Sequence, residues 1–118
     1  MGITDTFVNY LYDLSVSDLR KEAIEQARLC LLDFKGVTCA GAKMLQKRGC
    51  AFLDRVKKQG GNVSAVGFEQ KTTLHNAAFL NAMCAHMTEL DDGHRAGQIH
   101  LGASIIYALL PVSEVEGL

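Results

Sequence analysis

The sequence has 118 residues, of which 48% are apolar and 21% are charged, a balance typical of a globular chain. This length suits one folded domain, so we expect residues 1–118 to form a single unit. Twelve basic side chains against thirteen acidic ones leave a formal charge of −1, which argues against nucleic acid as a partner.

The N-terminal half predicts three amphipathic helices, the first of which is short and ends near residue 14. Ser15 and Asp18 form a variant of the capping box, and the apolar spacing behind them predicts a second helix over 18–41. A third helix over 43–58 has a basic last turn, and a glycine pair follows it. All three helices need a neighbour to cover their apolar faces.

The C-terminal half predicts two further helices that are apolar on nearly every side. The first runs over 74–90, and the second starts at 103 and continues to about 110 or beyond, with a kink or a stop predicted near Pro111. Because a helix that is apolar all round is normally buried, we expect 74–90 at the centre. The segment 63–68 is too short and isolated to build a sheet. The predicted fold is therefore all-α, a bundle of about five helices.

The cysteines and the absence of targeting signals indicate the cellular compartment. Cys30, Cys39, Cys50 and Cys84 show no C-x-x-C spacing and lie in apolar helical stretches, so we interpret them as reduced core thiols. No apolar stretch approaches the roughly 20 residues of a membrane span. The N-terminus lacks a basic segment followed by an apolar run. We therefore expect a cytoplasmic protein without membrane contact.

Titratable side chains gather between the two apolar helices. They are Glu89, Asp91, Asp92, His94, Arg95 and His100, with His86 on the preceding helix. Carboxylates and histidines in a partly dry cleft acquire shifted pKa values and can move protons near neutral pH, which would make an acid/base site. The alternative is structural, with aspartates capping backbone and a histidine satisfying a buried carbonyl. A metal site is a third interpretation, although the spacing matches no firm ligand pattern.

Three motifs resemble the MmgE/PrpD family, which includes 2-methylcitrate dehydratase, cis-aconitate decarboxylase and an iminodisuccinate epimerase. They are ARLCLLD over 27–33, AAFLNA over 77–82, and ELDDGHR over 89–95 followed by HLGA over 100–103. The resemblance covers the chain as the N-terminal helical part of the family. It implies an all-helical domain that pairs, in full-length members, with a smaller α+β lid domain, which we expect to be absent from this chain.

The resemblance also implies a chemistry. Family members act on small di- or tricarboxylates without a required metal or organic cofactor, so we expect a small carboxylate substrate, no metal and no cofactor. Carried over to this chain, the motif gives Asp91, Asp92 and His100 as catalytic candidates and Glu89, His94, Arg95 and His86 as substrate-binding candidates.

Two departures from the family bear on activity. The family has proline after the histidine matching His100 and often another where Tyr107 stands, whereas this chain has Leu101 and Tyr107 and places its only proline at Pro111. The sequence also ends before the parts that supply further basic and aromatic site residues in the family. Both departures weaken the expectation of full activity.

The leading hypothesis is a truncated or stand-alone MmgE/PrpD-like domain with lyase or isomerase ancestry, weak or inactive alone. If active, it would be a cofactor-independent lyase or epimerase acting on carboxylic acids. The alternative is a helical oligomerisation or interaction module that has lost catalysis. Apolar surface left uncovered at this length predicts a homo-oligomer, most simply a dimer, or a separate chain that supplies the missing part.

Overall fold

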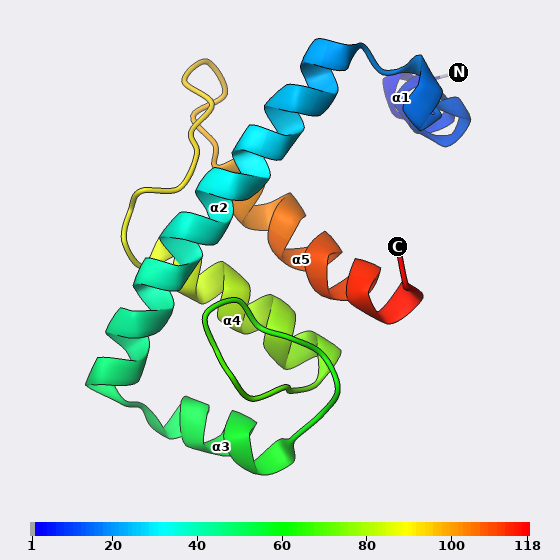
Figure 1. Ribbon diagram of the computed structural model, residues 1–118. Helices are drawn as coiled ribbons and strands as arrows, with labels where there is room; N and C mark the ends of the chain where they lie inside the picture. The colour runs from blue at the N-terminus through cyan, green and yellow to red at the C-terminus, as the bar shows by residue number, and fades with distance from the viewer. Residues whose placement is uncertain (1) are drawn as a thin grey trace.

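The computed structural model describes residues 2–118, apart from the side chain of residue 103, and the described residues form five α-helices and one short 3-10 turn (Figure 1). In chain order these are α1 (Ile3–Asp13), the turn η1 (Val16–Asp18), α2 (Lys21–Arg48), α3 (Ala51–Gln59), α4 (Leu74–His86) and α5 (Leu101–Glu116). Within the described residues the only β-type pairings are two isolated bridges, Val63 with Thr72 and His94 with Ile99. The prediction of an all-α fold is confirmed.

The sequence predicted helices over 18–41 and 43–58, and the structure has both, but the break lies later in the chain because α2 continues to Arg48 and α3 begins at Ala51. Gly41 does not end α2, because this glycine faces α4 at a point where an added Cβ would overlap the backbone carbonyl of Cys84. Glycine at this position therefore allows α2 and α4 to pack closely. The break falls instead at Gly49, whose φ of 65° is left-handed and easiest for glycine.

The core lies where α4 packs against α2 and α5, which confirms the central place predicted for α4 (Figure 1). The residues that α4 buries are Ala77, Leu80, Asn81, Cys84 and Ala85. The side of α4 that carries Phe79 faces outward, with this residue 56% exposed, so the helix is not covered on every side as its composition suggested. Thr73 caps its first turn by accepting a hydrogen bond from the Asn76 N–H.

Two helix ends differ from the prediction. Helix α4 ends at His86 rather than near residue 90, and Glu89 beyond it adopts a φ of 53°. Helix α5 begins at Leu101 and continues through Pro111 to Glu116, so of the two alternatives predicted at Pro111, a kink or a stop, the stop is wrong. Pro111 is fully buried, and packing against the core holds the helix although proline lacks one backbone donor.

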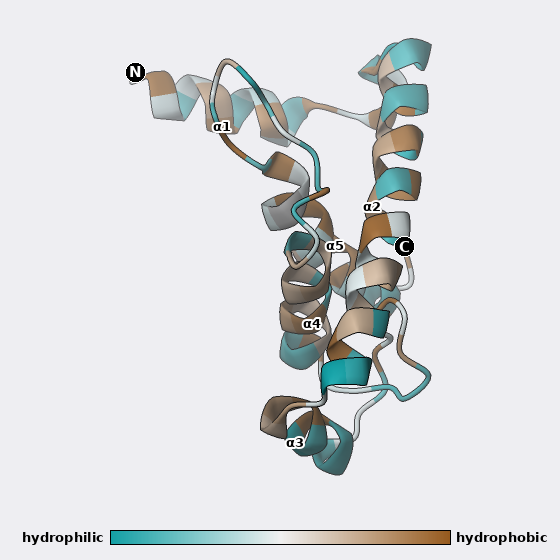
Figure 2. Cartoon of the chain, turned by 90° about the vertical axis from the view of Figure 1, so that its left-hand side faces the viewer, coloured by the Kyte–Doolittle hydropathy of each residue, from teal (hydrophilic) through white to brown (hydrophobic). Residues whose placement is uncertain are grey.

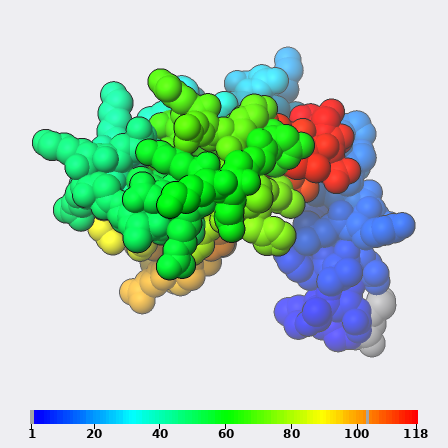
Figure 3. Space-filling model, turned by 90° about the horizontal axis from the view of Figure 1, so that it is seen from below, coloured from blue at the N-terminus to red at the C-terminus, as the bar shows by residue number. Residues whose placement is uncertain are grey.

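An N-terminal arm, defined here as residues 3–29, projects from the rest of the molecule, which we call the body (Figures 1 and 3). The capping box of Ser15 and Asp18 forms, but it begins η1 rather than the long helix. No residue of Ile3–Asp13 is buried. The radius of gyration is 16.2 Å, against about 13 Å for a compact domain of this length, and the projecting arm accounts for the excess.

The four cysteines are free, but their environments differ from the prediction. Cys84 is buried, Cys50 is partly buried, and Cys30 and Cys39 are exposed. The expectation of core thiols is therefore right for Cys84 and wrong for Cys30 and Cys39. Across residues 2–118, no helix combines the length and the apolar character needed to cross a membrane.

Candidate functional site

The segment after α4 folds back across the start of α5 and places Asp91 between two histidines. His86 is the last residue of α4, and His100 directly precedes α5. Asp91 Oδ2 lies 3.0 Å from His86 Nδ1 and 3.5 Å from His100 Nδ1. The Asp91 side chain is only 2% exposed, whereas the two imidazoles are about half exposed. A carboxylate shielded from water therefore holds two rings that solvent can reach.

His86 is arranged to keep its proton. The hydrogen bond to Asp91 raises the pKa of His86, and the negative charges of Asp91 and Glu89 raise it further. A carboxylate oxygen only accepts, so Nδ1 donates to Asp91, while Nε2 lies 3.5 Å from Glu89 Oε1. Both ring nitrogens face acceptors, which favours the imidazolium form.

His100 is arranged to expose a lone pair. Its Nδ1 lies 2.7 Å from the backbone carbonyl oxygen of Asp92, and because a carbonyl only accepts, this hydrogen bond assigns the ring proton to Nδ1. In the neutral ring, Nε2 then carries a free lone pair. The rings of His86 and His100 lie 5.6 Å apart between centroids. Two imidazoles with different hydrogen-bond arrangements therefore stand side by side around one carboxylate.

Asp92 connects this cluster to α5. Its carboxylate accepts the Gly102 N–H at 2.9 and 3.1 Å and so caps the first turn of the helix. A Cβ at Gly102 would overlap the same carboxylate, which explains glycine at this position. The side chain of Asp92 thus does the capping that the structural interpretation expected, while its carbonyl orients His100. A catalytic role for Asp92 stays a prediction.

The predicted substrate-binding residues divide into two groups. His86 and Glu89 belong to the Asp91 cluster, whereas His94 and Arg95 lie on an exposed hairpin closed by the bridge from His94 to Ile99. This hairpin borders an open groove of about 380 Å³, the outer groove, lined by Gly93, His94, Arg95, Gln98, Ile99 and His100. His100 is therefore the residue that joins the hairpin to the cluster.

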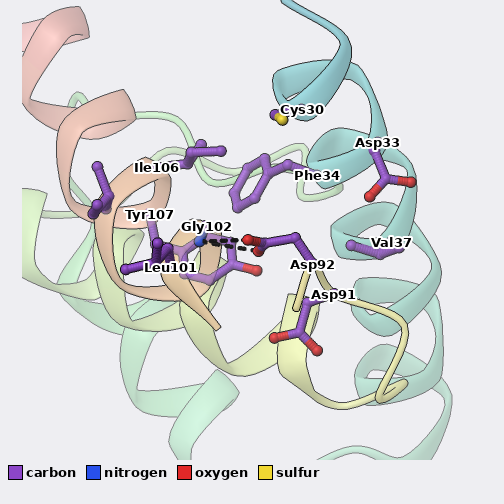
Figure 4. Close-up of a pocket in the computed structure, with 11 residues that line it drawn as sticks. Cys30, Asp33, Phe34, Val37, Asp91, Asp92, Leu101, Gly102, Ile106 and Tyr107 are labelled. Atoms are coloured by element: carbon purple, nitrogen blue, oxygen red, sulfur yellow. Dashed lines mark hydrogen bonds between the residues drawn. The ribbon is translucent and has the colours of Figure 1, made fainter. Parts of the chain in front are cut away.

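A second cavity, the inner pocket, lies on the other side of Asp91 and has a volume of about 300 Å³ (Figure 4). Its lining is Cys30, Asp33, Phe34, Val37, Asp91, Asp92, Leu101, Gly102, Ile105, Ile106 and Tyr107. Most of these side chains are apolar. The three carboxylates come from α2 and from the loop before α5.

Tyr107 is a site residue that sequence reasoning missed. It is 2% exposed, and its hydroxyl has no hydrogen-bond partner in the part of the chain that the structure describes. Burial raises the pKa of Tyr107, and the charges of Asp91, Asp92 and Asp33 add to the effect, so the hydroxyl stays protonated. The signal in the sequence that could have identified it is a tyrosine within the apolar run Ile105–Leu110, because a buried tyrosine hydroxyl needs a partner.

The described residues contain no group of three or more His, Cys, Asp or Glu side chains placed to hold a metal ion. What the fold and the cluster define is a helical domain with a loop of carboxylates and histidines between two core helices.

The family of the chain follows from comparison with known proteins. Residues 5–117 match the MmgE/PrpD N-terminal domain, so the chain belongs to the MmgE/PrpD family. The chain is also 27% identical over 117 residues to the cis-aconitate decarboxylase-like protein oryM of Aspergillus oryzae. That alignment covers 98% of this chain but 24% of the relative. No solved structure matches the chain.

Proposed function

We propose that this chain provides the acid/base part of a cofactor-independent lyase or isomerase that acts on small di- or tricarboxylates. The observation that carries the proposal is the buried Asp91 carboxylate between His86, which favours its charged form, and His100, which exposes a lone pair. Membership of the MmgE/PrpD family supports the class. The similarity to a cis-aconitate decarboxylase-like protein supports a carboxylic acid as the substrate.

In this proposal, His100 Nε2 removes a proton from the carbon next to a substrate carboxylate. The electron pair of the broken C–H bond moves into the carboxylate, which becomes enolate-like. His86 then donates its Nε2 proton to the leaving group or to the substrate carbon. Asp91 holds both rings and balances the positive charge that moves between them.

The substrate carboxylates bind in the outer groove, where Arg95 and His94 stand beside His100. Arg95 can pair with a carboxylate through two parallel hydrogen bonds. The Gly97 N–H donates to His94 Nδ1 at 2.9 Å, so the ring proton of His94 lies on Nε2. This Nε2–H can donate a hydrogen bond to a ligand. Arg95 and His94 supply too little positive charge to bind a tricarboxylate, because the carboxylates of Glu89, Asp91 and Asp92 lie nearby. We place the remaining binding groups in further sequence or in a partner chain.

Deuterium exchange tests the proton-transfer step without requiring complete turnover. The chain is incubated with cis-aconitate in deuterated buffer, and loss of the substrate methylene proton signal is followed by NMR. We expect exchange above the rate in buffer, and His100→Ala should lower it at least about a hundredfold, the ordinary contribution of a general base. His75→Ala, on the exposed first turn of α4, is the control and should exchange like the parent chain. Exchange at the buffer rate, or an unchanged rate in His100→Ala, contradicts the proposal.

A second candidate function, a helical oligomerisation module, is favoured by one specific observation. The apolar residues of the arm are exposed, among them Ile3, Phe7, Val8, Leu11 and Leu29. A module of this kind would associate in a concentration-dependent way and catalyse no exchange. The same deuterium experiment therefore separates the two functions.

A further inference from the structure

The inner pocket carries negative charge and has no cationic side chain among its lining residues. Asp91 already accepts a hydrogen bond from His86, and Asp92 accepts one from the Gly102 N–H. Asp33 stands on the opposite wall, on the side of α2, and is exposed (Figure 4). Its carboxylate is therefore accessible to a ligand that enters the pocket. The local field attracts a cation and repels a carboxylate.

A buried hydroxyl also points to a ligand. The Tyr107 ring enters the pocket from α5, and Figure 4 shows its oxygen directed toward the carboxylates of Asp91 and Asp92. This oxygen is buried and unpaired within the described residues. Most buried polar atoms have a partner, and an unpaired one destabilises the fold. A ligand with an N–H donor would satisfy the hydroxyl oxygen.

The rest of the wall decides the kind of cation. The rings of Phe34 and Tyr107 lie 4.3 Å apart between centroids, and Val37 and Ile106 complete an apolar surface. Such a wall suits an alkyl group, and aromatic faces attract ammonium ions. The described residues include no ligand set for a metal ion. The volume of about 300 Å³ lies at the lower end of small-molecule pockets, so the ligand is small.

We propose that the inner pocket is a binding site for a small organic ammonium ion. The ammonium group donates hydrogen bonds to the carboxylate of Asp33 and to the hydroxyl oxygen of Tyr107. Its alkyl group packs against Phe34, Val37 and Ile106. This site is separate from the outer groove, and it does not depend on the function proposed above.

Three probes of equal length but different charge test the site. The chain is titrated with n-butylammonium, n-butanol and n-butyrate while its amide and methyl NMR signals are followed. We expect n-butylammonium to shift the Gly102 amide and the Ile106 methyl signals in a saturable way, n-butanol to bind more weakly, and n-butyrate to leave them unmoved. Added salt should weaken binding of the ammonium probe.

Variants identify the residues responsible. Asp33→Asn should lower the affinity for n-butylammonium about tenfold, because a charge-assisted hydrogen bond becomes a neutral one. Tyr107→Phe should lower it several-fold. Glu22→Gln, an acidic residue on the same helix outside the pocket, is the matched control and should leave the affinity unchanged.

Equal binding of n-butanol and n-butylammonium would overturn the proposal, because the pocket would then be apolar without a charge preference. Absence of any shift at Gly102 and Ile106 would overturn it as well. An unchanged affinity in Asp33→Asn has the same consequence, and this variant decides the question even if Tyr107→Phe alters the fold, since Asp33 is exposed.

Discussion

The body and the arm share helix α2, yet this helix buries residues only in the body. In the body, Phe34 and Leu45 are 4% and 6% exposed, whereas Leu29 in the arm is 58% exposed. Figure 2 shows apolar residues along α1 and α2 in both regions. The difference arises because α4 and α5 pack against the later turns of α2. Apolar spacing thus tells which face needs cover, and only packing tells whether the cover is present.

The candidate site lies at the border between these regions. The inner pocket takes Cys30, Asp33 and Phe34 from α2 close to the point where burial begins. The Asp91 cluster closes the same pocket from the other side. Any partner that covers the arm would therefore also approach the site.

The largest expected effect is the loss of stability in Gly41→Ala, and Gly36→Ala on the same helix is its comparison. Gly41→Ala places a methyl group against the Cys84 carbonyl, so we expect a loss of about 3 kcal/mol or more in the free energy of unfolding. Gly36→Ala meets no atom within 4 Å and should stabilise the helix by about 0.5–1 kcal/mol. Urea denaturation followed by circular dichroism measures both. Similar values for the two variants would show that α2 and α4 do not pack as closely as described.

Thiol reactivity should next separate exposed from buried positions within the body. Burial raises the pKa of Cys84 to about 11 from an ordinary value of 9.0, which lowers its thiolate fraction about a hundredfold. We expect iodoacetamide at about pH 8 to modify exposed Cys30 and Cys39 first and Cys84 more than about a hundredfold more slowly. Mass spectrometry of the peptides gives the three rates. Modification of Cys84 as fast as Cys30 would mean that the core opens readily.

Self-association should depend on the arm. Replacing Phe7 and Leu11 together by serine removes two exposed apolar side chains from α1 and should weaken dimerisation by about 1–2 kcal/mol. Light scattering across a dilution series measures the change. Phe79→Ser, with a similar exposure on the body, is the control. A stronger effect of Phe79→Ser would place the interface on α4, and a monomeric parent chain would remove the prediction of a dimer.

The smallest expected effect is the loss of stability in Asp91→Asn. The pair of Asp91 and His86 contributes little, because His86 is half exposed and solvent screens its charge. A raised pKa means that protonated His86 stabilises the folded state at pH values below the ordinary histidine pKa, and that this contribution is lost as the pH rises through the folded-state pKa. Asp91→Asn should return the His86 pKa toward its ordinary value and cost more stability at about pH 5 than at about pH 8.

NMR titration of the His86 ring and denaturation at both pH values measure these effects. Glu89→Gln, which removes a smaller contribution, should lower the His86 pKa less than Asp91→Asn does. An equal fall in both variants would contradict the central place given to Asp91.

Local rules predicted well wherever a short segment decides the structure. The capping box of Ser15 and Asp18 forms as its spacing indicated. The polar loop between α4 and α5 was identified as the candidate site because so many titratable groups gather there. The sequence could not show that Asp91 is buried and that Asp92 caps α5, since both are loop aspartates next to each other and differ only in what they contact.

The sequence by itself determined that this chain is helical, that α4 is central, and that it belongs to the MmgE/PrpD family. These properties follow from periodicity and motifs, which are local. Only the tertiary structure decided that α2 runs through Gly41, that α5 continues past Pro111, and that Tyr107 enters the inner pocket. In the first two cases a neighbouring helix outweighs the local preference, because close packing with α4 or burial in the core stabilises a conformation that glycine or proline alone would disfavour.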